Sequence, residues 1–152
     1  MPDASRVVSL RTATLQDVPQ ILALERQSPR AAHWTAPQYE KLVSGGIVLV
    51  AEAPSGVCGF ICAQAVSNDW EIENVLVADQ FLRAGIGSAL VQELIQRAQQ
   101  AGVSAIQLEV RESNLPARRF YEKRGFCEVG RRRNYYADPV DNAILYDFRL
   151  SR

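Results

Sequence analysis

The chain has 152 residues, of which 47% are hydrophobic and 22% charged, and its 17 Lys and Arg balance its 17 Asp and Glu. This composition is that of a soluble globular protein, and the length favours a single domain over residues 1–152. No apolar run approaches the length of a membrane span and no signal peptide opens the sequence, so we expect a cytoplasmic protein with no membrane partner.

Charge is unevenly distributed along the chain. Residues 1–80 carry five Lys and Arg and nine Asp and Glu, a net of −4, whereas residues 81–152 carry twelve and eight, a net of +4. The run Arg131-Arg132-Arg133 could suggest nucleic acid, but alternate residues of a strand point to opposite faces. We therefore expect no direct nucleic-acid partner, and we expect a monomer or a weak dimer.

The sequence signals predict eleven elements in chain order. They are a strand at 7–12, a helix starting between 14 and 17 and ending by 29, a helix from 35 to about 45, strands at 47–52, 57–66 and 70–77, a helix opening at 85–87 and stopping at 102, a strand at 105–110, a helix at 115–124, and strands at 127–135 and 142–150. We interpret the remaining stretches, including 28–34 and 78–84, as loops.

Several ends are marked by specific residues. Thr35 and Gln38 form a capping box for the second helix, and Trp34 and Tyr39 are placed as a hydrophobic staple around it. The turn at 54–56 makes the flanking strands an antiparallel hairpin. Gly102 is the predicted C′ residue of its helix, the helix from 115 is capped by Ser113 or Asn114 and ended by Gly125, and a turn around Asp138-Pro139 joins the last two strands.

The order of these elements is βααβββαβαββ. Strands and helices in this order predict an α+β (or α/β) domain in which a mixed, seven-stranded sheet is flanked by four helices on both faces.

The three cysteines fit a reduced interior. Cys58 and Cys62 lie four residues apart on one predicted strand, roughly 13 Å, which is too far for a disulfide. We expect all three thiols to be buried and reduced and no metal site to exist, because no C-x-x-C occurs.

The stretch from 70 to 101 has the arrangement of a phosphate-binding site. A strand ending in Val75-Leu76-Val77 is followed by a loop, and Gly85-Ile86-Gly87 then opens a helix with apolar residues at 86, 89, 90, 94 and 98. Glycines let a ligand approach the backbone, and the first helical turn offers unpaired N–H groups to an anion. The dinucleotide pattern G-x-G-x-x-G fits poorly, because Leu90 occupies the position of the third glycine.

This stretch resembles the acetyl-CoA loop of the GNAT superfamily of N-acetyltransferases, Q/R-x-x-G-x-G/A. Gly85 and Gly87 match, and Leu82 departs from the pattern by occupying the Gln/Arg position, so the loop would rely on backbone amides and Arg83. The resemblance implies acetyl-CoA as cosubstrate, with its pantetheine arm paired like an added strand along the end of the predicted strand at 70–77. The implied contacts are Val75, Leu76, Val77, Arg83, Ala84, Gly85, Ile86, Gly87, Ser88, Asn114 and Tyr121.

A second block, LEVRESNLPARRFYEKRGF at 108–126, resembles the family segment L-E-V-R-x-S-N-x-x-A-x-x-x-Y-x-x-x-G-F. Together with His33-Trp34 and the run from Arg132 to Tyr136, it is similar to the bacterial ribosomal-protein-alanine N-acetyltransferases. The resemblance covers nearly the whole chain. It implies that the acceptor is a protein N-terminal α-amine, such as the N-terminal alanine of a ribosomal protein.

Glu109 is the candidate general base. An amine attacks only as the neutral species, and a carboxylate at a strand end can take its proton directly or through a water. The resemblance assigns this role to the glutamate of L-E-V-R, and Leu108 and Val110 would occupy the packed face. The alternative is a surface glutamate paired with Arg111 across the same face.

Tyr121 is the candidate general acid, twelve positions after the glutamate as in the family. A phenol with a pKa near 10 can protonate or hydrogen-bond the departing CoA thiolate. The alternative is a core stripe made by Phe120, Tyr121 and Ala117. Asn114 would both contact the cofactor and cap the helix.

The acceptor would be held by residues from three regions. Glu71 and Glu73 share a strand face and could bind the cationic amine or serve as an alternative base; otherwise they only solubilise a strand end. Tyr135 and Tyr136 would supply walls and hydroxyls, and the resemblance adds Trp34. The lone histidine, His33, is interpreted as a packing or loop residue.

These residues leave three functions open. The first is acetyl-CoA-dependent acetylation of a protein N-terminus, by direct attack in a ternary complex. The second changes the acceptor to a small-molecule amine or a lysine side chain. The third is a non-catalytic acyl-CoA-binding module on the same fold, since fold alone does not fix function.

Overall fold

The structure, a computed structural model, describes residues 7–28 and 33–150. Within these ranges the chain forms a mixed seven-stranded sheet and four α-helices in the order βααβββαβαββ, which confirms the predicted fold. The elements are β1 (Ser9–Thr12), α1 (Val18–Gln27), α2 (Ala36–Gly45), β2 (Ile47–Ala53), β3 (Gly56–Val66), β4 (Asp69–Val77), α3 (Ile86–Gln100), β5 (Ala105–Arg111), α4 (Leu115–Lys123), β6 (Cys127–Ala137) and β7 (Val140–Arg149). The strand order in the sheet is β1-β2-β3-β4-β5-β7-β6.

The boundaries differ from the predicted ones mainly at turns. β1 starts at Ser9, two residues later than predicted, and the β6–β7 hairpin extends two residues further toward its turn on each strand. Short 3-10 helices occupy Leu15–Asp17 and Asp79–Phe81. The second of them lies in the stretch 78–84, which was predicted as a loop. Residues 29–32 of the predicted loop at 28–34 lie outside the described residues.

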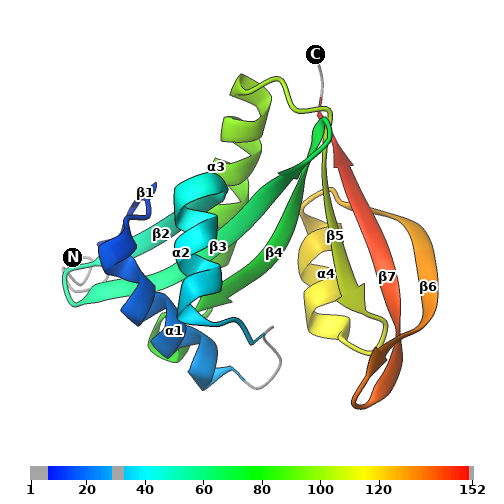
Figure 1. The fold of residues 1–152 in the computed structure, drawn as a ribbon, viewed down its shortest axis with the longest axis horizontal. Coiled ribbons are helices and arrows are strands. Elements are labelled where there is room, and N and C mark those ends of the chain that lie inside the picture. Colours follow the sequence, from blue (N-terminus) through cyan, green and yellow to red (C-terminus); the bar gives the residue numbers. More distant parts are fainter. Residues whose placement is uncertain (1–6, 29–32, 151–152) are drawn as a thin grey trace. The chain divides into compact units, whose positions relative to one another are not determined.

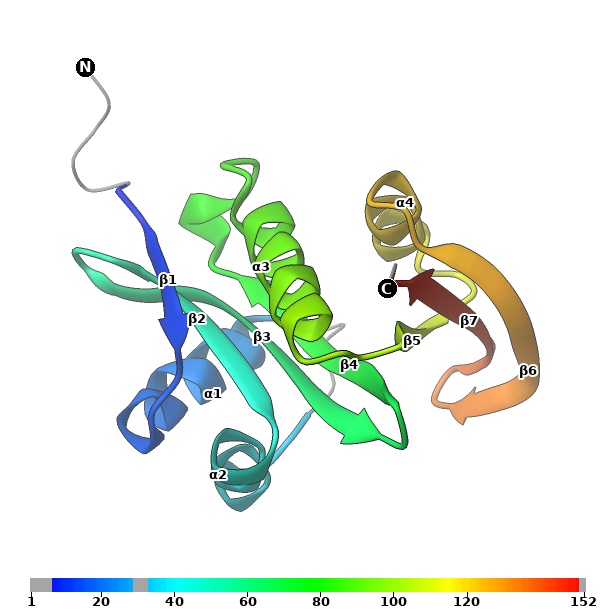
Figure 2. The ribbon, with the colours of Figure 1, turned by 90° about the horizontal axis from the view of Figure 1, so that it is seen from above.

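The chain divides into two compact units. One comprises the chain up to Ala65 together with Ile72–Arg97, and the other comprises Val66–Glu71 and the chain from Ala98 onward. In the first unit, α1 and α2 lie on one face of the β1–β3 strands and α3 lies on the other (Figures 1 and 2). Its core is formed by side chains with no measurable exposure from both layers, including Ile21, Tyr39, Leu49, Phe60, Ile61, Leu90 and Leu94.

The apolar stripe of α3 is wider than predicted. Ile86, Leu90, Leu94 and Ala98 are buried as expected, but Ala89 is exposed, and Val91 and Ile95 are buried in addition. A stripe more than about 100° wide is what a helix lying against a sheet requires. The helix ends as predicted. Gly102 takes a φ of +76°, and the amides of Gly102 and Val103 donate to the carbonyls of Gln99 and Ala98.

The start of α2 follows its sequence signals. The Thr35 side chain accepts a hydrogen bond from the Gln38 amide, and the Gln38 side chain accepts one from the Thr35 amide, so the capping box is confirmed. The rings of Trp34 and Tyr39 lie 5.8 Å apart, which confirms the staple. Tyr39 also packs edge-on against Phe60 at 5.8 Å and thereby anchors α2 to the sheet.

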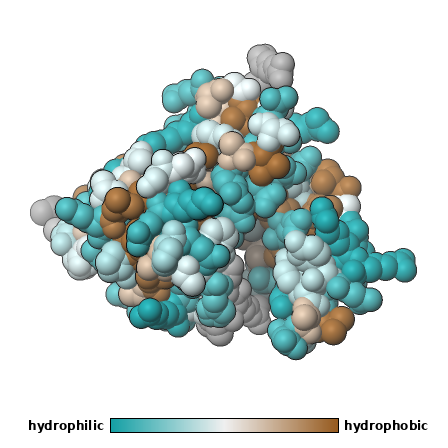
Figure 3. All heavy atoms as spheres, in the orientation of Figure 1, coloured by the Kyte–Doolittle hydropathy of each residue, from teal (hydrophilic) through white to brown (hydrophobic). Residues whose placement is uncertain are grey.

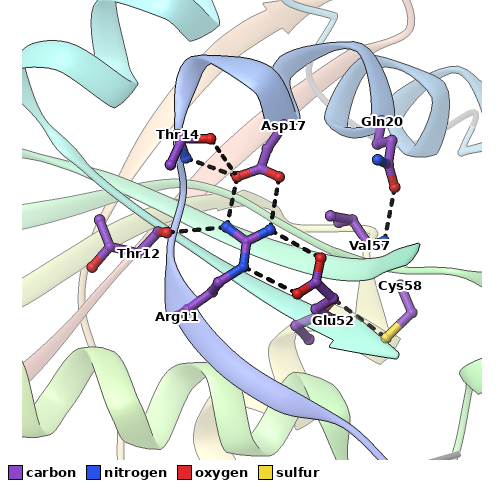
Figure 4. Close-up of polar contacts among 9 residues, drawn as sticks. Arg11, Thr12, Thr14, Asp17, Gln20, Glu52, Val57 and Cys58 are labelled. Atoms are coloured by element: carbon purple, nitrogen blue, oxygen red, sulfur yellow. Dashed lines mark hydrogen bonds and ion pairs between the residues drawn. The ribbon is translucent and has the colours of Figure 1, made fainter. Parts of the chain in front are cut away.

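A cluster of charged residues links β1 and the 3-10 helix at Leu15–Asp17 to β2 (Figure 4). The Arg11 guanidinium donates to both carboxylate oxygens of Asp17 at 2.8 and 2.9 Å and to both oxygens of Glu52 at 3.1 and 3.3 Å. Asp17 is buried and also accepts from the Thr14 amide at 2.7 Å. The hydrogen bond from Arg11 lowers the pKa of Asp17, so its charged form is favoured by folding.

Asp17→Asn should therefore destabilise the protein in a pH-dependent way. Because the pKa of Asp17 is lowered on folding, its contribution is present above the unfolded value near 4 and is lost as the pH falls through the folded value. We expect the variant to lose about 2 kcal/mol of unfolding free energy at pH 7, since charged hydrogen bonds are involved. Urea denaturation at pH 7 and pH 3 measures both values. An equal loss at the two pH values would show that the carboxylate charge is not the cause.

The second unit contains α4 and the antiparallel strands β5, β7 and β6, with β5 paired in parallel to Trp70 and Glu71 of β4. Helix α4 has no fully buried residue, so Phe120, predicted as core, is only half-buried. Polar contacts help to attach the helix to β7. The buried Tyr146 hydroxyl donates to Glu122 at 2.6 Å and accepts from Arg118 Nε at 3.0 Å. Among the two predicted caps, Asn114 is the one that accepts from an α4 amide, at 3.3 Å.

On the face drawn in Figure 3 most residues are hydrophilic, and the hydrophobic ones form small separate groups. Cys58 and Cys62 are buried as predicted, and burial raises the pKa of both thiols, whereas Cys127 is exposed, contrary to the prediction. Within residues 7–28 and 33–150, no helix is long and apolar enough to cross a membrane, and no group of His, Cys, Asp and Glu could hold a metal ion.

Candidate active site

The predicted anion loop lies in the first unit, between β4 and α3. Ala78 fixes its start by donating to the Cys58 carbonyl at 2.7 Å, and the buried Phe81 fixes the 3-10 helix. Beyond it the side chain of Leu82 is 55% exposed and the backbones of Arg83 and Gly85 have φ of +64° and +81°. A Cβ placed on Gly85 would meet nothing within 4 Å, so the space beside this backbone is open.

The start of α3 presents its amides at this loop. The amide of Ala89 donates to the Gly85 carbonyl at 2.9 Å, which begins the helical ladder. Helix geometry therefore leaves the amides of residues 86–88 without acceptors inside the helix. These amides and the adjacent open glycine suit an anionic pyrophosphate, because the helix dipole favours negative charge there. Val75, Leu76 and Val77 precede the loop and are half-buried.

Glu73 and Asn74 of β4 face two different neighbours in this unit. Glu73 accepts a hydrogen bond from Gln64 Nε2 at 2.7 Å. The Asn74 amide donates to the Tyr39 hydroxyl at 3.3 Å, and this hydroxyl donates to the carboxylate of Glu25. Glu71, predicted to share a face with Glu73, belongs to the second unit.

Glu25 is a polar residue that the sequence analysis missed. Its carboxylate is 3% exposed, accepts from the Trp34 amide at 2.8 Å, and lies 3.8 Å from the Nδ1 atom of His33. Burial together with this carboxylate raises the pKa of Tyr39. The available signal was that Glu25 lies on α1 beside Leu24 and four residues after Ile21, both of which are buried. The Glu25 carboxylate fixes the backbone of Trp34, whereas the His33 side chain is 70% exposed.

Glu109 lies on β5, in the second unit. Leu108 and Val110 are buried, as predicted, and the Glu109 side chain is 25% exposed on the other face. Its ion-pair partner is Arg132 of β6, at 3.5 Å from Nε to Oε1. The predicted alternative of a pair with Arg111 is wrong, since Arg111 donates to the Pro139 carbonyl at 2.8 Å.

Two tyrosines of β6 lie beside Glu109. Tyr135 and Tyr136 meet edge to face at 5.1 Å, and the Arg111 guanidinium lies 4.4 Å from the centre of the Tyr136 ring. The pKa of Tyr135 is raised mainly by a hydrogen bond to Glu109, and the charge of Glu71 adds a smaller increase. The pKa of Tyr136 is raised mainly by burial. The second unit thus groups four predicted site residues, Glu71, Glu109, Tyr135 and Tyr136.

Tyr121 lies on α4, in the same unit. Its ring is half-buried and contacts Phe120 at 5.1 Å and Phe126 at 5.4 Å, both nearly perpendicular. Aromatic packing on two sides fixes the ring while the residue stays partly exposed. Ala117, the third member of the predicted core stripe, is also only half-buried.

The comparisons with known proteins identify the family. The sequence model of the acetyltransferase (GNAT) family matches residues 15–126, and the chain belongs to this family. The ribosomal protein bS18-alanine N-acetyltransferase of Escherichia coli (strain K12) is 36% identical over 97 residues, which are 62% of this chain and 66%, slightly under two thirds, of that protein. An N-alpha-acetyltransferase of Sulfurisphaera tokodaii is 31% identical over 154 residues, 90% of each chain.

Solved structures agree with this assignment. The crystal structure of the ribosomal-protein-S18-alanine N-acetyltransferase from Escherichia coli superposes with a TM-score of 0.87 and 27% identity, over 96% of each chain. The match confirms the GNAT fold and the similarity to this kind of N-acetyltransferase.

Proposed function

We propose that the protein is an acetyl-CoA-dependent N-acetyltransferase whose acceptor is the α-amine of a protein N-terminus, such as the N-terminal alanine of a ribosomal protein. The observation that carries the proposal is the setting of Glu109. It is a partly exposed carboxylate on a strand whose neighbouring residues are buried, and its charge contributes to the raised pKa of Tyr135 and of Tyr136. The names of the relatives from Escherichia coli and Sulfurisphaera tokodaii support the same acceptor class.

The reaction follows from the charges involved. Glu109 takes a proton from the acceptor ammonium, and the freed nitrogen attacks the acetyl carbonyl carbon. The nitrogen of the tetrahedral intermediate gives its second proton to water, the carbon–sulfur bond breaks, and the CoA sulfur leaves with the hydroxyl proton of Tyr121. The Tyr121 phenolate and the protonated Glu109 return to their starting states by exchange with solvent, so the products are the acetylated amine, CoA and one released proton. No acyl-enzyme forms, because the amine attacks the thioester directly in a ternary complex.

Acetyl-CoA would be held by the first unit. The pyrophosphate would lie at the amides of residues 86–88, where the open space beside Gly85 admits it and Arg83 adds positive charge. The exposed side chain of Leu82 provides no donor, so the affinity depends on these backbone groups. Val75–Val77 would pair with the pantetheine arm, and Asn114 would add a contact from α4.

The acceptor class follows from proton affinity. A lysine amine has a pKa near 10.4 and an α-amine one near 8, so the neutral fraction of lysine at neutral pH is lower by roughly a hundredfold. A single carboxylate as base suits the α-amine. Tyr135, Tyr136 and Trp34 would line the acceptor, and Glu71 or Glu73 would attract its ammonium.

The proposal is tested by measuring CoA release with three acceptors. These are a peptide beginning with alanine, the same peptide beginning with a bulky residue, and a small polyamine. We expect fast release with the alanyl peptide only. Release with the polyamine alone would favour a small-molecule acetyltransferase, and acetyl-CoA binding without any release would favour a non-catalytic module.

Tyr121→Phe should slow turnover by about tenfold with unchanged stability. Only the hydroxyl is lost, and the ring contacts with Phe120 and Phe126 remain. The effect is smaller than for a general base because a thiol with a pKa near 8.5 is already a tolerable leaving group at neutral pH. Initial rates with saturating alanyl peptide measure it. A wild-type rate would leave Tyr121 with a packing role only.

A further inference from the structure

Strand β6 departs from a regular ladder beside Glu109. Arg132 is paired with Ala143 of β7 and Tyr136 with Asp141, so three residues of β6 lie opposite a single residue of β7. The bulge is fixed at its centre. Asn134 has a φ of +51°, and its amide donates to Oδ1 of Asn142 at 2.9 Å. Bulges of this kind redirect side chains.

The bulge changes which side chains reach Glu109. On a regular strand, residues 132 and 135 are separated by three positions and point to opposite faces. Here Arg132 Nε lies 3.5 Å from Oε1 of Glu109. Glu109 is also the main cause of the raised pKa of Tyr135, which lies on the same bulged segment. The Arg132 guanidinium also lies 5.6 Å from the centre of the Tyr135 ring. The bulge therefore places Arg132 against the Glu109 carboxylate and Tyr135 beside Arg132.

We propose that Arg132 and Tyr135 are positioning residues that hold the Glu109 carboxylate in the orientation needed to accept the acceptor's proton. The inference rests on the proposed role of Glu109 as the base. An ionised carboxylate offers about four lone-pair positions, so two donors leave positions free for the incoming amine. A base that is held in place raises the turnover number, because proton transfer depends steeply on geometry.

The neighbours of Glu109 support this division of roles. On β5 itself, Arg111 is engaged with Pro139 and Tyr136, and Glu71 of β4 contributes a like charge near Tyr135. The β7 residue opposite Glu109 is Leu145, which has no charge. Of the charged groups described around the carboxylate, Arg132 is the one that forms an ion pair with it.

Both positioning residues are exposed enough to be changed without unfolding the protein. The Arg132 side chain is 57% exposed and Tyr135 is 50% exposed. Arg131 offers a matched control, since it is 49% exposed on the same strand and pairs with Glu112 at 3.0 Å. Substitution of Arg131 removes the same charge from β6 but leaves the contact with Glu109 intact.

The first test measures the contact without reference to activity. NMR of ring-labelled tyrosine, assigned with Tyr135→Phe, should show Tyr135 ionising at a higher pH than a free tyrosine. Glu109→Gln should shift this titration back toward the ordinary value, because the hydrogen bond to Glu109 is the main cause of the raised pKa. Glu128→Gln, which removes a carboxylate paired with Arg118 at 3.7 Å, should leave it unchanged.

The second test is a double-mutant cycle on turnover of the alanyl peptide. Arg132→Gln should lower kcat by about two- to fivefold, as expected for an exposed ion pair, and Tyr135→Phe by roughly tenfold. The KM for acetyl-CoA should not change, Arg131→Gln should have the wild-type rate, and Arg132→Lys should keep most of the activity. In the Glu109→Gln background, Arg132→Gln should have no further effect.

The two tests separate this inference from the proposed function. The positioning role would be overturned if Glu109→Gln left the Tyr135 titration unchanged, or if Arg132→Gln lowered kcat equally in the wild-type and Glu109→Gln backgrounds. In either case a slow Glu109→Gln enzyme would still support Glu109 as the base. A wild-type rate for Glu109→Gln would instead overturn the base assignment, and the titration would still report whether the contact exists.

Discussion

Glu109→Gln should lower the turnover number by about 10²–10⁴-fold, the range typical of lost general-base catalysis. Glutamine has nearly the same shape as glutamate, so the strand should remain folded. The ion pair with Arg132 is partly exposed at 3.5 Å, and its loss should cost little stability. The large loss of rate therefore reports the proton-accepting charge.

Initial rates with saturating acetyl-CoA and alanyl peptide measure this effect, together with acetyl-CoA binding by calorimetry. Binding should stay near normal, because the loop that would hold the cofactor lies between β4 and α3. Glu128→Gln is the matched control. It removes an exposed carboxylate that is also paired with an arginine, and it should retain the wild-type rate. A Glu109→Gln enzyme close to wild type would move the base to Glu71, Glu73 or solvent.

The second large effect is expected in cofactor binding. Gly85→Val should reduce acetyl-CoA affinity by at least about a hundredfold in calorimetry. The open space beside Gly85 would be filled by a branched side chain where the pyrophosphate should approach, and a φ of +81° is unfavourable for any residue with a Cβ. Gly87→Val should also weaken binding, because its branched side chain would lie where the pyrophosphate should approach.

Strain and steric block can be separated with Gly102→Val. Gly102 follows the other end of α3, has a similar φ of +76°, and also has open space around its Cβ position. It should show the same kind of destabilisation while binding acetyl-CoA normally. Normal binding by Gly85→Val, or no binding by the wild type, would contradict the assignment of this loop.

Sequence signals that act over a few residues predicted most of the fold. The capping box at Thr35 and Gln38, the turn before β3 and the glycine after α3 each depend on local backbone chemistry, and all three are present. The 3-10 helix at Asp79–Phe81 was missed because three residues carry no periodic pattern. The burial of Val91 and Ile95 was missed because the sheet covers a wider face of α3 than a minimal stripe suggests.

The site was less predictable because its contacts join distant parts of the chain. Alternation along β5 indicated that Glu109 faces away from the core, but its partner Arg132 depends on a bulge in β6. Asn134 is the one local signal, because asparagine adopts a positive φ more readily than most residues, but this preference does not specify how many residues a bulge contains. The contact between Glu25 and Tyr39 likewise links α1 to α2, and a lone glutamate on an amphipathic helix does not reveal a buried partner.

The most direct test of the central claim is to locate the acetyl group by mass spectrometry. One peptide carries a free N-terminal alanine and an internal lysine, and the second is the same peptide with its N-terminus blocked. Incubated with the protein and acetyl-CoA, the first should gain a single acetyl group on the α-nitrogen, and the second should gain none. Equal labelling of the blocked peptide, on its lysine, would contradict the proposed acceptor.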